Sequence, residues 1–355
     1  PLSLLDQRAD LLAGMAWVKR AYIDHEACLA LHRQASELLD RDPDALSGRN
    51  QQLLAAELKG LQAWLDKSSA PEATLSLVRQ SWDRLRGELA RSHCNVVLAL
   101  AYTSQELGEL DFAMEVVRTT LQEATNWPLA ARCRVAHAAG FFHLCNGDSA
   151  EAEKQFRRNL LLAEQHTLPI IALISRHGLG AIADLRNQLD QAKEHHLEVI
   201  RQPYLTTGRD AVVDMYSLIG IYARDGEQEK SRALVGELMA SAQLAGRPFF
   251  LEQVAALDAY TDLTCGKRKR ALLWALGVPD SQMSATFDRI PLIRARILLA
   301  EASMVCLVKA EQILQELLRF YSTSHVWYRQ TEILVLQALV KDGLGQADSA
   351  LATLA

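Results

Sequence analysis

The sequence predicts an all-α solenoid, in which antiparallel helix pairs stack on one another along the chain. Two observations lead to this prediction. Apolar residues recur at helical spacing along almost the whole chain, and the alternating β-branched runs that indicate strands are missing. Short polar breaks interrupt the helices at nearly constant intervals, as in LGELDFA, NGDSAEA and LGQADSA. A fixed period of this kind is typical of repeat architectures.

The period is measured from a small residue that closes each break. Successive members of this series lie 39 or 40 positions apart; they are Ala113, Ala152, Ala192, Ser231, Ala271, Ala310 and Ala350. Ala73 extends the series upstream by 40 positions, and Ala27 precedes it at a looser step of 46. We expect each of these residues to anchor one helix pair, which gives about nine pairs in all.

The breaks carry turn signals. Five anchors have a glycine five positions earlier, where the first helix must end and glycine adopts a left-handed conformation cheaply; these are Gly108, Gly147, Gly226, Gly266 and Gly345. A second small residue, such as Gly180, lies twelve positions before the anchor and lets the two helices approach closely. Asp148 and Glu151 fit an N-cap and its N3 partner. The stretch ASMVCLVKA (302–310) lacks the glycine, so we expect a tighter turn there.

One break, CGKRKRA, concentrates four cations between Lys267 and Arg270. Because it occupies a repeat turn, we interpret it as a solvated turn. A basic docking patch for another domain or an acidic partner is the alternative. The Walker phosphate loop does not fit, since it would require glycine where Thr261 stands.

Composition narrows the class of protein. The chain has 355 residues, 49% of them hydrophobic, and a net charge of −5. We expect residues 1–355 to form a single repeat domain that is a piece of a larger protein. Direct nucleic-acid binding is not expected, because nucleic-acid-binding domains ordinarily carry a basic excess. Six scattered cysteines form no CxxC or zinc pattern, which indicates reduced thiols in the cytoplasm. Since neither an apolar run of membrane-span length nor a signal peptide occurs, no membrane contact is expected.

The spacing of small residue, glycine and alanine resembles that of the tetratricopeptide (TPR) helix pair, whose usual period is about 34 residues. The resemblance implies a right-handed superhelix of longer, TPR-like pairs. This long unit resembles the helical-repeat domain of MalT-type regulators, the ATP-dependent members of the LuxR class. The most specific stretches are PLIRARILLAEAS (291–303), AEQILQELL (310–318) and TEILVLQALVKDGLGQADSALATLA (331–355).

The resemblance to MalT-type regulators implies two further domains outside this chain: an NTPase that binds ATP, and a LuxR-type DNA-binding domain. The chain would hold no cofactor of its own. It would be the segment that senses an effector and contacts its own NTPase and DNA-binding domains, and it could also self-associate.

Catalytic motifs are missing, so no catalytic or metal-binding residues are expected and the chain is predicted not to be an enzyme. The glycines of HGLGAIAD (177–184) lie in a helical repeat with no strand before them, and we interpret them as close helix packing. His195 and His196 are adjacent, hence about 100° apart on a helix, and are poor joint metal ligands.

The concave wall of such a superhelix consists of the first helix of each pair. The inward positions of the usual TPR unit, applied here, give a stripe of aromatic and polar side chains of the type that ligand and peptide sites favour; they are Tyr102, Arg134, His137, Phe141, His177, Tyr216 and Tyr260. The repeat around 292–302 has only aliphatic residues at these positions. Each aromatic residue could instead belong to the core between repeats.

We therefore expect a non-enzymatic sensing and protein-interaction domain of a cytoplasmic bacterial transcriptional regulator. It would bind a small molecule or a regulatory protein on the superhelix. Unequal affinity for two states would then bias oligomerisation and DNA binding by the other domains. The alternative is a general TPR scaffold or peptide-binding protein without a role in transcription.

Overall fold

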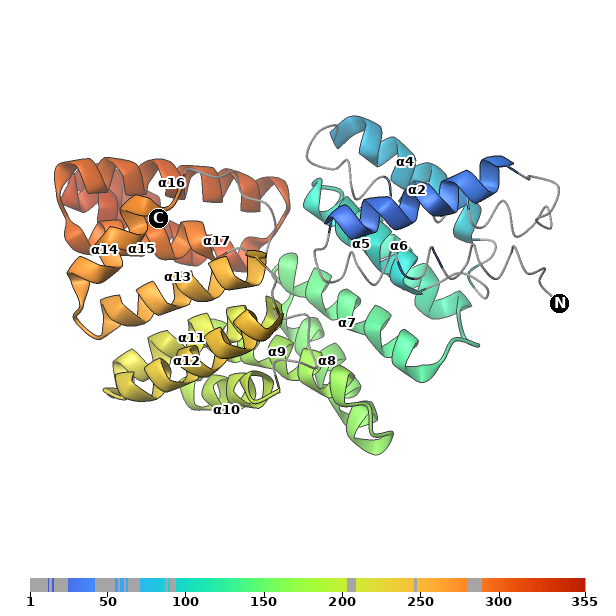
Figure 1. Cartoon of the computed structure of the whole chain (residues 1–355), viewed down its shortest axis with the longest axis horizontal. Helices are drawn as coiled ribbons and strands as arrows, with labels where there is room; N and C mark the ends of the chain where they lie inside the picture. Colours follow the sequence, from blue (N-terminus) through green and yellow to red (C-terminus); the bar gives the residue numbers. More distant parts are fainter. Residues whose placement is uncertain are drawn as a thin grey trace. The chain divides into compact units, whose positions relative to one another are not determined.

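The computed structural model describes residues 25–41, 71–86, 94–202, 209–245, 248–279 and 289–354, with a few isolated positions before residue 94. Every regular element in these ranges is a helix (Figure 1). The predicted all-α helical-repeat fold is therefore confirmed. No helix in the described ranges is long and apolar enough to cross a membrane.

Seven consecutive helix pairs follow one another in the described part of the chain. They are α5 (Cys94–Glu106) with α6 (Leu110–Glu123), α7 (Leu129–Cys145) with α8 (Ser149–Gln165), α9 (Pro169–Leu185) with α10 (Leu189–Ile200), α11 (Arg209–Asp225) with α12 (Gln228–Ala245), α13 (Pro248–Thr264) with α14 (Arg268–Gly277), α15 (Ile290–Glu301) with α16 (Met304–Thr323), and α17 (Trp327–Gly343) with α18 (Ala347–Leu354). Helices α2 (His25–Arg41) and α4 (Pro71–Leu85) precede them, and the remainder of the first two predicted pairs lies outside the described residues.

The helices form two compact units, Pro1–Phe142 and His143–Ala355. Helices α8 to α18 belong to the second unit. The single domain expected for residues 1–355 stays a prediction.

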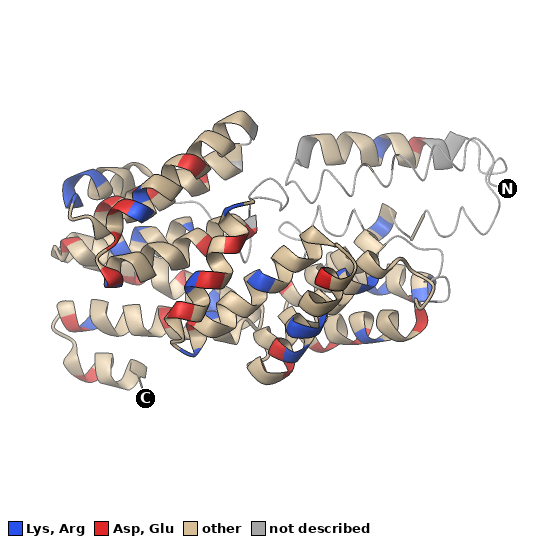
Figure 2. Cartoon of the chain, turned by 90° about the horizontal axis from the view of Figure 1, so that it is seen from below, with Lys and Arg blue, Asp and Glu red and all other residues tan. Residues whose placement is uncertain are grey.

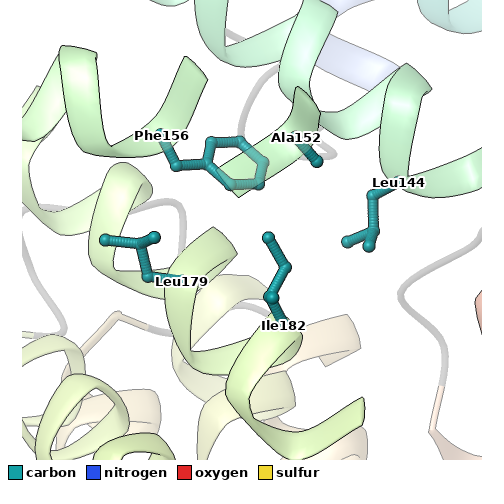
Figure 3. Packing of buried hydrophobic residues seen from close by; sticks show 5 residues of the cluster. All are labelled: Leu144, Ala152, Phe156, Leu179 and Ile182. Carbon is teal, nitrogen blue, oxygen red and sulfur yellow. The ribbon is translucent and has the colours of Figure 1, made fainter. Parts of the chain in front are cut away.

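The predicted anchors hold the pairs together. All seven from Ala113 to Ala350 lie in second helices and are at most 7% exposed. Figure 3 shows the joint between α8 and α9, where Phe156 packs with Leu179 and Ile182 beside the Ala152 anchor. A Cβ atom placed on Gly178 would stand only 2.5 Å from the Phe156 ring. The predicted close packing of this glycine-containing helix is therefore confirmed.

The turns also follow the predicted chemistry. All five turn glycines have positive φ, between 72° and 91°. The Oδ1 atom of Asp148 accepts a hydrogen bond from the backbone N–H of Glu151 at 3.0 Å, as expected for an N-cap. The glycine-free turn is tight: Ala302 takes a left-handed conformation with φ 58°, and Ser303 immediately caps α16.

Two upstream anchors are placed one position away from the buried residue. Ala73 is exposed, and the fully buried position in α4 is Thr74. Ala27 is half-buried, and its neighbour Cys28 is fully buried. The anchor predicted at Ala73 is wrong because the buried face of α4 runs through Thr74, Val78 and Leu85, which recur at helical spacing.

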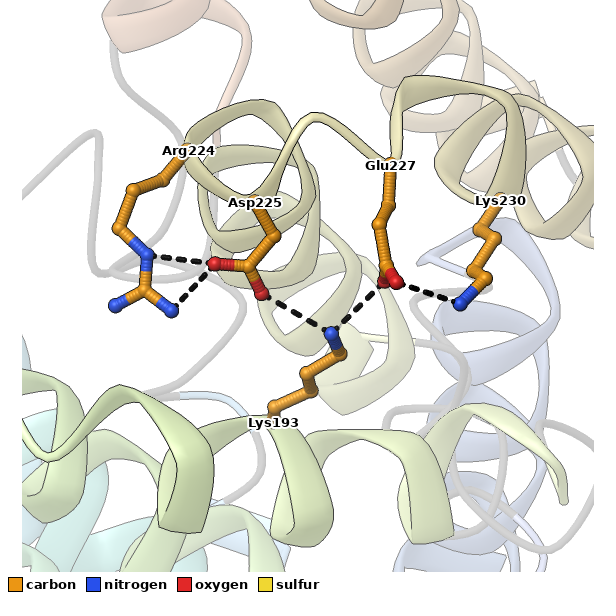
Figure 4. A network of polar contacts seen from close by, with 5 residues as sticks. All are labelled: Lys193, Arg224, Asp225, Glu227 and Lys230. Carbon is orange, nitrogen blue, oxygen red and sulfur yellow. Dashed lines mark hydrogen bonds and ion pairs between the residues drawn. The ribbon is translucent and has the colours of Figure 1, made fainter.

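Charged groups join neighbouring repeats at the surface. Lys193 of α10 donates to Asp225 at 3.1 Å and to Glu227 at 3.0 Å, across the turn between α11 and α12 (Figure 4). Figure 2 shows that basic and acidic residues are interspersed along the helices. Exposed pairs of this kind each contribute about 0–1 kcal/mol, so they add little to packing.

The basic stretch 267–270 is exposed, as interpreted from the sequence, but only Lys267 lies outside a helix, since Arg268, Lys269 and Arg270 form the first turn of α14. Lys267 is the N-cap residue of α14, and the four cations are exposed. Arg270 reaches back to α13, where its guanidinium pairs with Asp258 at 2.5 Å and with Asp262.

Candidate functional site

The first helices of successive pairs in the second unit pack side by side. Helix α9 lies against α11, α11 against α13, α13 against α15, and α15 against α17. We call this surface the first-helix wall. Charged and polar side chains replace ordinary apolar packing at two places along this wall, and both places include residues of α11.

The first place joins four helices of the wall and is called here the tyrosine–arginine cluster. It contains Tyr216 of α11, Tyr260 of α13, Arg296 of α15, Arg329 and Glu332 of α17, and Arg289 immediately before α15. The Tyr216 hydroxyl donates to Glu332 Oε1, although the two residues are 116 positions apart. Arg296 Nε donates to the same hydroxyl at 2.7 Å, and Arg296 Nη2 donates to Glu332 Oε1 at 2.5 Å. The contacts therefore connect three non-adjacent segments of the chain directly.

The aromatic rings of the cluster lie against its cations. Tyr216 and Tyr260 stack with centroids 5.2 Å apart and an interplanar angle of 22°. The Arg289 guanidinium lies 5.3 Å from the Tyr216 centroid, and the Arg296 guanidinium lies 5.9 Å from both centroids. These distances are in the range of cation–π attraction.

Burial and charge fix the protonation states. Burial, with the nearby Glu332 carboxylate, raises the pKa of Tyr216 well above its ordinary value. Burial alone would also raise the pKa of Glu332, but Arg296 and the Tyr216 hydroxyl outweigh it and lower that pKa. Glu332 is consequently ionised at neutral pH, while Tyr216 keeps its proton and donates it.

Arg289 is the least satisfied member of the cluster. Its side chain is fully buried, and none of its three guanidinium nitrogens has a hydrogen-bond partner. Only its backbone N–H is paired with a side chain, at 3.0 Å from Gln253 Oε1. Burial, and then the positive charge of Arg329, lower the pKa of Arg289. Because an arginine side chain does not lose its proton in proteins, a buried positive charge remains here that no carboxylate of the described residues hydrogen-bonds.

The second place is a chain of buried histidines and aspartates between α9, α10 and α11, which we call the His–Asp chain. His196 Nδ1 contacts Asp214, and its Nε2 lies 3.0 Å from Asp184 Oδ2. His177 Nδ1 lies 3.1 Å from both carboxylate oxygens of Asp214. Carboxylates only accept, so both nitrogens of His196 must carry protons.

The pKa values in the His–Asp chain agree with an imidazolium. Burial alone would lower the pKa of His196, but Asp214 and Asp184 raise it to about 9. Burial would raise the pKa of Asp214, whereas the two histidines lower it to about 2. His177 behaves like His196, since Asp214 outweighs the effect of burial and raises the pKa of His177. These groups hold one another in their charged forms, as a buried ionic joint does.

The structure distributes the seven predicted site residues over separate places. Tyr216 and Tyr260 meet in the tyrosine–arginine cluster, and His177 belongs to the His–Asp chain. The other four lie in the first unit. There Tyr102 contacts Phe141 with centroids 5.7 Å apart, and Arg134 Nη1 donates to Asn95 Oδ1 at 2.6 Å. His137 is half-buried on the same helix as Arg134.

Sequence reasoning missed the charged partners. Helix α15 was expected to present only aliphatic residues on the inner face, but Arg296 projects there beside the predicted Ala295 position. The prediction is wrong because the register of a shorter repeat was applied to a longer one. Asp214 and Glu332 could have been found as acidic residues within otherwise apolar helical runs.

His196 of the EHH stretch (194–196) is buried and packs against Gly180. A Cβ atom on Gly180 would lie 2.6 Å from the His196 Cε1 atom. Within the described residues no group of three His, Cys, Asp or Glu side chains is arranged to hold a metal ion.

Comparison with known proteins places the fold. No family model matches the chain, and no curated protein matches it. Among solved structures, the apo form of the quorum sensor NprR from B. thuringiensis superimposes with a TM-score of 0.57 at 15% sequence identity, over 97% of this chain and 89% of that one. The chain has a TPR-like helical-repeat fold. A Rap protein complexed with Competence and Sporulation Factor matches with a TM-score of 0.49 at 10% identity, over 97% of this chain and 99% of that one.

Proposed function

We propose that this chain is a sensor module that binds an effector at the tyrosine–arginine cluster. The observation that carries the proposal is the convergence of four successive first helices on one polar and aromatic site. Arg296 and Glu332 are 30% and 25% exposed, so a ligand can reach the cluster from solvent. A ligand that exchanges contacts with Tyr216, Arg296 or Glu332 changes how these helices are held relative to one another. Binding is thereby converted into a change of shape.

The wider context of this proposal rests on resemblance. A quorum sensor uses the same fold, which supports a sensing role. The stretches 291–303, 310–318 and 331–355, which resemble MalT-type regulators, support a place in a cytoplasmic transcriptional regulator. The effector would be a small molecule or a regulatory protein, and ATP and DNA would bind other domains. The chain would bind no cofactor and catalyse no reaction.

Ligand screening tests the binding role. A panel of short peptides, sugars and phosphorylated metabolites is scanned for compounds that raise the melting temperature of the chain. Hits are compared with the Tyr216→Phe variant, which loses the hydroxyl bridge, and with Arg270→Ser as a surface control. We expect a hit whose affinity falls in Tyr216→Phe and is unchanged in Arg270→Ser. Hits that bind all three proteins equally would place the effector site elsewhere.

The role in transcription has a separate test. The full-length reading frame is expected to encode a Walker-type NTPase loop upstream and a helix-turn-helix downstream of this chain. A reading frame with neither would instead favour a general scaffold or peptide-binding protein.

A further inference from the structure

We propose that Arg289, immediately before α15, and Arg329, in the first turn of α17, form the binding site for a doubly negative group of the effector, such as a phosphate monoester or a pair of carboxylates. This inference rests on the proposed sensing function and names the chemistry of its ligand. Its support comes from charge, from unsatisfied donors and from access.

The charge of the cluster does not balance. Arg289, Arg296 and Arg329 contribute three positive charges, and in the described residues around them Glu332 is the negative partner. Glu332 is already engaged by Arg296 and by the Tyr216 hydroxyl. Among the described residues, two positive charges are therefore left without a counter-ion. Buried charges are ordinarily paired because taking an unpaired charge out of water is costly.

The unsatisfied donors point to the same place. All three guanidinium nitrogens of Arg289 and the Nε of Arg329 are buried without a hydrogen-bond partner. The planar guanidinium fork matches the paired oxygens of phosphate and carboxylate. Arg289 is also the N-cap residue of α15, and its side chain makes no cap hydrogen bond. The amino end of that helix adds the positive end of its dipole to the site.

The partly exposed side of the cluster carries charges of both signs. Arg289 is fully buried, whereas Glu332, Arg296 and Arg329 are partly exposed. The Glu332 carboxylate lies within the cluster and repels an anion that approaches Arg289 and Arg329. Removing that charge should strengthen anion binding, whereas removing the Arg289 charge should abolish it. Opposite effects from two neighbouring residues are not expected of unspecific salt binding.

The experiment measures binding of inorganic phosphate, succinate and chloride to the chain by calorimetry, at constant ionic strength and about pH 7.5, where phosphate is mainly a dianion. Four proteins are compared: the native chain, Arg289→Met, Glu332→Gln and the exposed control Arg270→Ser. We expect saturable one-to-one binding of a dianion to the native chain, about tenfold weaker or lost in Arg289→Met and about tenfold tighter in Glu332→Gln. Arg270→Ser should match the native chain.

A stability measurement guards against misfolding of the variants. Replacing an unpaired buried charge by an apolar side chain of similar volume is neutral or stabilising. Arg289→Met should thus melt at or above the native temperature without dianion, and should no longer be stabilised when the dianion is added. A variant that melts lower and still responds to the dianion would overturn the proposal.

The arms separate the outcomes. Phosphate binding without succinate binding identifies a phosphoryl group, and the reverse identifies a dicarboxylate; both support the site. Chloride binding of equal strength, no dianion binding to the native chain or to Glu332→Gln, or unchanged binding in Arg289→Met would overturn it. An effector from the ligand panel that is insensitive to Arg289→Met would refute this inference and leave the proposed function standing. Dianion binding to the native chain, with no effector found in the ligand panel, would support the anion site and count against the proposed sensing function.

Discussion

Replacing Gly180 by alanine tests the joint between α9 and α10. In an open helical position this change stabilises a protein by about 0.5–1 kcal/mol, because alanine is the better helix former. At Gly180 the new Cβ atom would stand 2.6 Å from His196 Cε1 and 2.8 Å from His196 Nδ1. Carbon atoms in contact prefer about 3.5–4.0 Å, so the ring must move by about 1 Å.

The ring cannot move without cost. His196 contacts Asp214 through Nδ1 and lies 3.0 Å from Asp184 through Nε2, so a shift of this size breaks at least one hydrogen bond to a charged group. Such a bond contributes about 1.5–3 kcal/mol, and overpacking adds about 1–3 kcal/mol. After the gain in helix propensity, we expect Gly180→Ala to lower the free energy of unfolding by about 2–4 kcal/mol.

Gly236 is the matched control. It lies within α12, is exposed, and has no atom within 4 Å of an added Cβ. We expect Gly236→Ala to raise stability by about 0.5–1 kcal/mol. Urea unfolding of both variants measures the two changes as shifts of the midpoint at an unchanged slope. If Gly180→Ala is also stabilised, the His196 ring does not lie where the structure places it and the buried joint is wrong.

Three further predictions concern pH, a turn and the basic stretch. The pKa of His196 is raised in the folded state to about 9 from an unfolded value of about 6.5, so its contribution is complete below about pH 6.5 and is lost as the pH rises through 9. Urea unfolding should therefore show that the free energy of unfolding falls between about pH 7 and pH 9.5, and falls less steeply in Asp214→Asn than in the native chain. Equal pH dependence in the two proteins would contradict the ionic joint. Ala302→Gly should raise the free energy of unfolding by about 0.5–1 kcal/mol, measured as a higher urea midpoint, because Ala302 has a left-handed φ of 58°. A lower midpoint would show that the turn is not strained. Changing all four cations of 267–270 to serine should leave the circular dichroism spectrum unchanged. The turn interpretation would be refuted if the native chain bound DNA sequence-specifically and this variant did not.

Much of the fold follows from the sequence because repetition multiplies a weak signal. One alanine in a helix says little, but a small residue every 39 or 40 positions locates each joint, and Ala152 and Ala192 are fully buried as expected. Turn glycines add a backbone requirement that few other residues meet. The same reasoning failed at Ala73, although its step of 40 is regular, because a shift of one position decides which side of a helix is buried.

The candidate site was less predictable because it depends on contacts between repeats rather than within one. Tyr216 and Tyr260 were selected from an inward register, and both belong to the cluster. Glu332 lies 116 positions from Tyr216, and nothing in a repeat period specifies which side chains will meet across three pairs. Arg296 was missed because the inward register of a 34-residue unit was applied to a repeat of 39 or 40 residues, in which an error of one position selects Ala295 instead.

Helix α11 contributes a polar side chain to both the His–Asp chain and the tyrosine–arginine cluster. Asp214 and Tyr216 are two residues apart, hence about 200° apart around the helix, so they project from nearly opposite sides. Asp214 fixes α11 to α9 and α10 through two histidines, whereas Tyr216 fixes it to α15 and α17 through Arg296 and Glu332. The first tie is buried and the second is partly buried, and each includes an ion pair; removing one partner of a buried ion pair is strongly destabilising. A ligand that exchanges contacts with Tyr216 therefore changes the contacts that hold α11, the helix that also contains Asp214. The His–Asp chain is accordingly the first place outside the cluster where an effect of binding should be measurable, as a change in the NMR titration of His177 and His196.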